Sequence, residues 1–167
     1  MSFFQSEKLA KNGYLVKKGM PCNRLCLIEK GYLRFFSYSE KKVITHWIFR
    51  EGQLVTDVAS FHLQEPAKWN IQALSDTRIY SLSFASFQKM RTSIPQWDAY
   101  EKILLVKLMS ALENRVYALL SMSAEARYQY LFATDSKMFQ ELPLNYLASM
   151  LGMTPETLSR IRGKYAS

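Results

Sequence analysis

The sequence predicts an α+β protein in which an antiparallel β-roll is followed by a long helix and then by two short helices joined by a tight turn. Three observations support this fold class. Short runs of aromatic and β-branched residues, broken by glycines, fill residues 14–83, a pattern typical of small antiparallel sheets. Residues 96–122 contain neither glycine nor proline, which favours one continuous helix. Apolar residues at helical spacing recur on both sides of Gly152.

The β-roll is predicted from seven short segments whose composition is that of strands. Gly13, Gly19, Gly31 and Gly52 separate several of them, and glycine is the usual residue of tight turns. The predicted strands are residues 14–16, 25–28, 32–37, 43–49, 54–57, 70–74 and 78–82.

Two helices are predicted to follow the roll. A short one begins at Phe84 and ends before Pro95, and a long one runs from Gln96 to about Met122. The long helix has one apolar seam at a four–three spacing and a second seam beside it. The first seam consists of Leu105, Met109, Leu112, Val116 and Leu119, and the second of Leu104, Leu108, Ala111 and Ala118. Two seams favour contact with both the roll and another subunit, although a monomeric core helix is the alternative.

Ser123 is a candidate N-cap for the helix that begins the last part of the chain. We therefore predict three parts: a β-roll over residues 1–94, a long helix over residues 95–123 and a helical domain over residues 124–167.

The last predicted helix pair is built around Gly152. Leu144, Leu147, Ala148 and Leu151 form the apolar stripe of the first helix, and a glycine just after such a stripe can close it in the left-handed conformation. Thr154 then suits an N-cap, and Pro155 suits the first position of the second helix. Together with Leu158 and Ile161, this spacing is that of a helix-turn-helix.

The outward face of the second helix carries Glu156, Ser159 and Arg160. Arginine can donate to guanine O6 and N7, glutamate can accept from cytosine N4, and serine can do either. We expect these three to reach DNA bases and Arg162 and Lys164 to contact mainly phosphates. Thr154, at the start of the helix, is also predicted to contact DNA. The alternative is a plain helical hairpin with a solvated charged face.

The segment LASMLGMTPETLSRIR closely resembles the C-terminal signature of the cyclic-AMP receptor protein and fumarate–nitrate regulator (Crp/Fnr) family of bacterial transcription regulators. LVKKGMPCNRLCLIEKGYLRFF and VTDVASFHLQEPAKWNIQAL resemble that family's early strands and its phosphate-binding cassette. The resemblance runs from about Tyr14 to Tyr165. It implies a cyclic-nucleotide-binding-like roll, a dimerisation helix, half-site recognition by Glu156, Ser159 and Arg160, and a homodimer that binds double-stranded DNA and RNA polymerase.

The cassette departs from the family pattern at the residues that would hold a cyclic nucleotide. Ligand-binding members carry Gly-Glu and, about ten residues later, Arg followed by Ser or Thr; the matching positions here are Thr56, Asp57, Ala67 and Lys68. With Ser60 they form the predicted effector pocket. Loss of the bidentate arginine argues against tight cyclic-AMP binding, so no cofactor is assigned. Two alternatives to a cyclic-AMP-binding roll stay open. The roll has lost its ligand, or it binds a different, small anionic effector.

The formal net charge of +8 is placed mainly in the first half of the chain, with +7 over residues 1–94, 0 over residues 95–123 and +1 over residues 124–167. Charge alone therefore gives weak support for nucleic-acid binding. The sequence also ends at Ser167, just after the second helix, so we expect no wing strands there, and its start is short enough that a leading helix and first strand are expected to be reduced.

Other function classes find little in the sequence. There is no glycine-rich phosphate loop, no Gly-x-Ser-x-Gly elbow and no nucleophile paired with a base, so we predict no catalytic residues. Two histidines and two cysteines do not make a histidine-rich or Cys₄ site, so no metal is predicted. No long apolar run marks a membrane span or signal peptide, and we expect a cytoplasmic protein. A small-molecule-sensing or partner-binding roll that no longer binds DNA is the alternative to the regulator.

Overall fold

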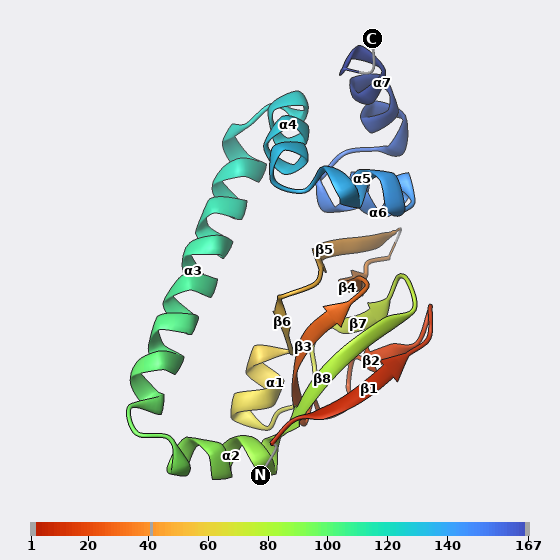
Figure 1. Cartoon of the computed structure of the whole chain (residues 1–167). Coiled ribbons are helices and arrows are strands. Elements are labelled where there is room, and N and C mark those ends of the chain that lie inside the picture. Colours follow the sequence, from red (N-terminus) through yellow and green to blue (C-terminus); the bar gives the residue numbers. More distant parts are fainter. Residues whose placement is uncertain (1–2, 41, 166–167) are drawn as a thin grey trace. The chain divides into compact units, whose positions relative to one another are not determined.

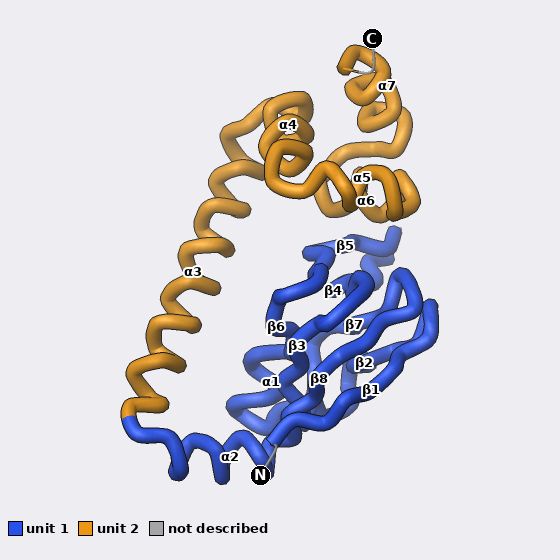
Figure 2. Tube along the Cα trace, in the orientation of Figure 1, with its two compact units in different colours: residues 1–95 blue, residues 96–167 orange. Residues whose placement is uncertain are grey.

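The computed structural model describes residues 3–40 and 42–165. Its elements are shown in Figure 1, and Figure 2 shows the two compact units into which they divide, residues 1–95 and residues 96–167. Each unit is described by itself.

Strands of the first unit form two antiparallel four-stranded sheets. The first sheet has the order β1 (Gln5–Leu9), β8 (Thr77–Ser83), β3 (Arg24–Lys30) and β6 (Leu54–Val55). The second sheet has the order β2 (Tyr14–Val16), β7 (Asn70–Ala73), β4 (Leu33–Tyr38) and β5 (Val43–Phe49). Within both sheets every pair of neighbouring strands is antiparallel. The predicted antiparallel roll and the α+β class are confirmed.

The core of the roll is apolar and is contributed by both sheets. Leu33 and Ile71 of the second sheet and Cys26 of the first are fully buried in one cluster. Both sheets contribute buried side chains to this cluster, and their burial supplies the main driving force for folding the roll.

Two elements of the roll were not predicted from the sequence. β1 pairs with β8 along its whole length, but its sequence, QSEKL, lacks the apolar alternation by which strands are recognised. The second unpredicted element is a short helix, which begins where the predicted strand at residues 54–57 was expected to end. The predicted strand was therefore too long. The strand stops at Val55, and α1 (Val58–Leu63) begins after it because the Asp57 side chain caps the helix.

Helix α2 (Phe84–Ser93) follows β8 directly, as predicted. Ser83 caps it by accepting a hydrogen bond from the backbone amide of Ser86 at 3.1 Å. Phe87 packs its ring edge-on against Phe61 of α1, with ring centroids 5.2 Å apart. Aromatic packing therefore joins α1 to α2.

The second unit begins with the predicted long helix, α3 (Trp97–Ser121), of whose described side chains none is buried. Four shorter helices follow: α4 (Ala124–Thr134), α5 (Ser136–Glu141), α6 (Leu144–Met150) and α7 (Pro155–Tyr165). Ser123 caps α4 and Asp135 caps α5, each through a backbone amide three residues later. Among the described residues, no helix is long and apolar enough to cross a membrane.

A small core holds the last four helices together. Tyr128 of α4 packs edge-on against Phe139 of α5, with ring centroids 5.3 Å apart. Leu147 of α6 and Leu158 of α7 are both fully buried. Because α6 and α7 share this core, the position of α7 is set by packing as well as by its connecting turn.

Candidate nucleic-acid interface and effector pocket

The turn between α6 and α7 is fixed by backbone hydrogen bonds around Gly152. The Gly152 amide donates to the carbonyl of Ser149 at 3.1 Å, and the Met153 amide donates to the carbonyl of Ala148 at 3.0 Å. These two bonds, with Gly152 at φ +67°, form a Schellman motif. The structure therefore uses Gly152 in the left-handed conformation that the sequence predicts.

The start of α7 is capped by Thr154. Its Oγ1 accepts a hydrogen bond from the backbone amide of Thr157 at 3.2 Å, and its carbonyl accepts one from Leu158. Hydrogen bonds from the backbone amide of Glu156 and from the Thr154 hydroxyl keep the pKa of the Glu156 carboxyl below its usual value. Glu156 is thus an anion, held at the N-terminal end of the helix.

The residues predicted to contact bases lie on one exposed face of α7. Glu156, Ser159 and Arg160 are all exposed, while Leu158 and Ile161 face the core. Spacings of three and four residues place the three exposed side chains next to one another. The structure therefore brings together an acceptor, a hydroxyl and a guanidinium in the first turns of α7.

The two residues predicted to contact phosphates differ in their surroundings. Arg162 is half-buried. Lys164 lies 3.3 Å from the Glu125 carboxylate of α4, and the Tyr165 hydroxyl donates to the same carboxylate at 2.7 Å. The Tyr165 and Lys164 contacts lower the pKa of the Glu125 carboxyl. Lys164 thus already has an anionic partner within the protein.

The apolar seams of α3 are exposed in the single chain. Met109, Leu112 and Val116 of the first seam have exposed fractions of 61%, 60% and 55%. Leu108 of the second seam is also exposed. A helix with so much exposed apolar surface is typical of a protein–protein interface.

Asp57, the carboxylate of the predicted effector pocket, accepts hydrogen bonds from backbone amides of the protein itself. It is only 2% exposed. Its Oδ1 accepts from the backbone amide of Ser60 at 3.2 Å, and its Oδ2 accepts from the backbone amide of Lys68 at 3.1 Å. In this arrangement Asp57 caps α1 and holds the segment that follows it.

Of the other predicted pocket residues, Ser60 and Thr56 also form hydrogen bonds within the protein. The Ser60 hydroxyl donates to the carbonyl of Glu65 at 2.5 Å and accepts from the Cys22 amide at 2.9 Å. The Thr56 hydroxyl donates to the carbonyl of Arg24 at 2.9 Å. Ala67, which occupies the position of the family's arginine, is 3% exposed, and Lys68 is an exposed cation beside it.

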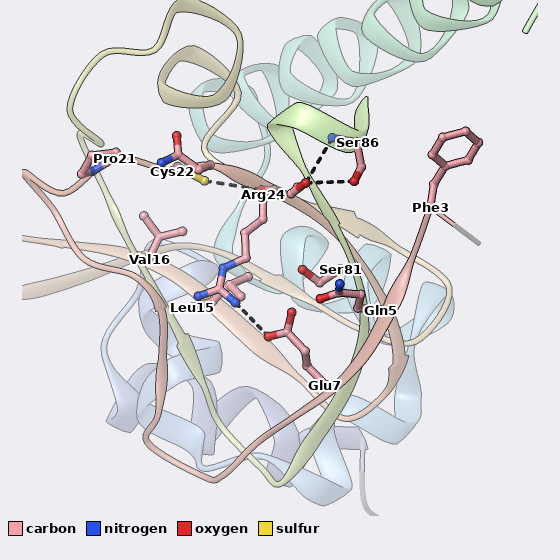
Figure 3. Close-up of a pocket in the computed structure, with 12 residues that line it drawn as sticks. Phe3, Gln5, Glu7, Leu15, Val16, Pro21, Cys22, Arg24, Ser81 and Ser86 are labelled. Carbon is pink, nitrogen blue, oxygen red and sulfur yellow. Dashed lines mark hydrogen bonds and ion pairs between the residues drawn. The ribbon is translucent and has the colours of Figure 1, made fainter. Parts of the chain in front are cut away.

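A separate pocket of about 380 Å³ lies between β1, β3, β8 and the end of β2 (Figure 3). Arg24 and Glu7 form an ion pair of 2.8 Å in its wall, and Figure 3 shows the Arg24 side chain directed toward Glu7. Buried Leu15 and Val16 contribute an apolar part. None of the residues predicted for the effector pocket lines this hollow.

Sequence reasoning missed these lining residues, because β1 was not predicted and charged side chains at strand positions usually face solvent. It also missed Arg115 of α3 and Arg127 of α4, whose guanidinium groups donate to carbonyls at the end of α6. Arg127 follows the cap residue Ser123 by four positions, but the carbonyl groups of Leu151 and Gly152 that it contacts are distant in sequence. Among the described residues, no cluster of three or more His, Cys, Asp or Glu could hold a metal.

Comparison with known families and structures gives a consistent result. The model of the cyclic nucleotide-binding domain matches residues 6–93. A search of curated proteins found no match.

Three solved structures illustrate the similarity of fold. FixK2 from Bradyrhizobium japonicum has a TM-score of 0.82 at 14% identity, over 96% of this chain and 83% of its own. A CooA mutant from Carboxydothermus hydrogenoformans has a TM-score of 0.75 at 20% identity, over 98% and 77%. A protein from Eubacterium rectale described as a transcriptional regulator of the Crp/Fnr family has a TM-score of 0.72 at 18% identity, over 98% and 78%.

Proposed function

The chain belongs to the cyclic nucleotide-binding domain family and has the fold of the Crp/Fnr regulators, and on this premise we propose that it is a DNA-binding transcription regulator that recognises a palindromic site as a homodimer. In this proposal residues 1–94 are a sensor domain with a degenerate or altered effector pocket. Residues 95–123 form the dimerisation helix, and residues 124–167 bind DNA.

The exposed triplet on α7 is the observation that carries the proposal. Glu156, Ser159 and Arg160 share a face in the first turns of a helix whose start is capped by Thr154 and whose opposite face is buried. Recognition helices of this type contact base edges through their N-terminal residues. Arg160 is proposed to read guanine and Glu156 to accept from cytosine N4, with Ser159 supporting them.

The exposed seams of α3 support the homodimer. Burying Leu112 or Met109 against a second copy would contribute roughly 1.5–3 kcal/mol each relative to leaving the side chain in water. In the proposed homodimer the two copies of α7 would enter successive major grooves, so the half-sites would lie about 34–36 Å apart, one turn of DNA. The proposed dimer would therefore account for the apolar surface of α3, and its two-fold symmetry would match a palindromic site.

The residues of the predicted effector pocket already form hydrogen bonds within the protein, which supports the proposal that this pocket is degenerate or altered. Asp57 would have to give up its hydrogen bonds to two backbone amides before it could bind a ribose hydroxyl. Ala67 offers no guanidinium for a phosphate. We propose that the protein binds DNA without cyclic AMP.

The test is selection of DNA from a random duplex pool by the wild type, by Arg160→Ala and by Arg162→Ala, with and without cyclic AMP and at two salt concentrations. The wild type is expected to enrich a palindrome. Arg160→Ala is expected to lose preference at one base pair per half-site, at a cost on the order of 1–3 kcal/mol. Arg162→Ala should instead weaken binding to all sequences. Equal losses on every sequence for Arg160→Ala would contradict its role in reading bases.

The pocket in Figure 3 favours one alternative, a small-molecule-sensing or partner-binding roll that no longer binds DNA. The near-neutral charge of residues 124–167 is in its favour, and the exposed triplet on α7 is against it. If the wild type enriches no DNA sequence, this alternative replaces the regulator.

A further inference from the structure

Two arginines bind the C-terminal end of α6. Arg115 Nη2 donates to the carbonyl of Met150 at 2.7 Å, and Arg127 Nε donates to the carbonyl of Leu151 at 2.8 Å. The last carbonyl groups of a helix lack donors within the helix and form the negative end of its dipole. The two guanidinium groups therefore stabilise the end of α6 by charge-assisted hydrogen bonds.

Arg127 binds the end of α3 as well. Its Nη1 donates to the carbonyl of Met122 at 2.7 Å, directly after the last residue of α3, and its Nη2 lies 3.5 Å from the carbonyl oxygen of Gly152. One planar guanidinium thus connects the end of α3, the end of α6 and the turn before α7. A lysine ammonium could not hold all of these carbonyls in the same geometry.

Since no described side chain of α3 is fully buried, hydrogen bonds from the two arginines are important for fixing α3 against the helices that follow it. Arg115 is half-buried and reaches from α3 to the end of α6, and burial lowers the pKa of its guanidinium. Leu119 packs so tightly against the turn that a Cβ added at Gly152 would lie 3.0 Å from its Cδ2. Two arginines and this close contact therefore help to hold α3 against the end of α6 and the turn before α7.

We infer that Arg115 and Arg127 are positioning residues that fix the direction of α7 relative to α3, and so set the half-site spacing that the dimer accepts. The inference rests on the proposed function, because α3 must be the dimer axis and α7 the helix that enters the groove. In such a dimer, any rotation at the junction of α3 with α6 changes the distance between the two copies of α7. A rigid junction selects one spacing, and a loose junction tolerates several.

The test compares duplexes that carry two copies of the selected half-site at the preferred spacing and at spacings one base pair longer or shorter. The proteins are the wild type, Arg115→Met, Arg127→Met and the double variant. For the wild type, a change of one base pair should weaken binding about tenfold or more, comparable to a mismatched base pair. For the double variant the loss should fall to about threefold or less, while affinity for an isolated half-site stays within about twofold of the wild type.

Two controls separate positioning from general stability. Lys107→Met removes a cation from an exposed position of α3 and should keep the wild-type spacing preference. Arg115→Lys keeps the positive charge and N–H donors, though not the planar guanidinium, and its spacing preference should lie closer to the wild type than that of Arg115→Met. Amide hydrogen exchange at Gly152 and Met153 gives a measurement without DNA, and it should be faster in the double variant.

An unchanged spacing preference in the double variant would overturn the inference, as would unchanged exchange at the turn. Equal loss of spacing preference and of half-site affinity would also overturn it, because that result describes a structural role alone. A wild type that selects no palindrome overturns the proposed function itself, and the two failures are therefore distinguishable.

Discussion

The Asp57 carboxylate accepts a hydrogen bond from the backbone amide of Lys68, 3.1 Å away and eleven residues later in the chain. This bond closes the segment that the sequence predicted as part of the effector pocket. The same carboxylate caps α1 through Ser60. The residue that most resembles a ligand-binding group in the sequence is therefore a structural group in the fold.

Replacing Asp57 should destabilise the roll. Asp57→Ala leaves one buried and one partly buried backbone amide without their acceptor, and the free energy of unfolding is expected to fall by about 2 kcal/mol. Asp57→Asn keeps one acceptor oxygen and should cost less. Urea unfolding of the three proteins measures both changes. A loss for Asp57→Ala of only a few tenths of a kcal/mol would show that water replaces these bonds.

Restoring the family's arginine should not restore a cyclic-nucleotide site. Ala67 is buried, its amide donates to the carbonyl of Met20, and its carbonyl accepts from the amide of Gly19. Ala67→Arg would force a charged side chain into this packing, so it should lower stability by about 1–3 kcal/mol. Titration calorimetry with cyclic AMP should show no saturable binding for the wild type or the variant. Saturable binding by the variant would mean that the segment can rearrange.

Two glycines of the second unit should respond to alanine in opposite directions. Gly152 has φ +67° and a close neighbour in Leu119, so Gly152→Ala should destabilise the protein by about 1–2 kcal/mol. Gly163 lies within α7 in open space, so Gly163→Ala should stabilise it by about 0.5–1 kcal/mol. Thermal or urea unfolding measures both. Stabilisation by Gly152→Ala would contradict the Schellman turn.

The contact between α4 and the end of α7 should depend on pH. The Tyr165 hydroxyl and Lys164 lower the pKa of the Glu125 carboxyl in the folded protein. Its contribution to stability is therefore complete above the ordinary glutamate value of about 4.3 and is lost as the pH falls through the lowered value. The difference in unfolding midpoint between the wild type and Glu125→Gln should shrink over that acidic range. A constant difference between pH 6 and pH 3 would rule out this linkage.

The sequence predicted the elements whose pattern is local. The β5 strand, with its run of aromatic and β-branched residues, was predicted at its observed bounds, and so was the turn at Gly152, where one residue type satisfies a special backbone conformation. β1 was missed because its polar sequence is held by pairing with β8. α1 was missed because its N-cap, Asp57, was predicted to belong to the effector pocket. In the structure this carboxylate accepts from the Ser60 amide within the helix and from the Lys68 amide beyond it.

The candidate site, too, combines features that follow from local sequence with features that depend on contacts distant in sequence. Glu156, Ser159 and Arg160 could be placed on one face from their spacing alone, and the structure places them there. The contacts of Arg115 and Arg127 with backbone carbonyls could not be predicted, because a carbonyl acceptor has no signature in sequence. Whether a carboxylate such as Asp57 is free for a ligand depends on which amides the fold brings to it.

The exposed seams of α3 have a consequence for how the proposed regulator would respond to its own abundance. When two chains must meet before either α7 can occupy its half-site, the amount of active protein at low concentration rises with the square of the amount of chain. Doubling expression would then raise operator occupancy by up to about fourfold. Synthesis and degradation of the chain would thereby become a sensitive means of control, even with no small molecule in the roll.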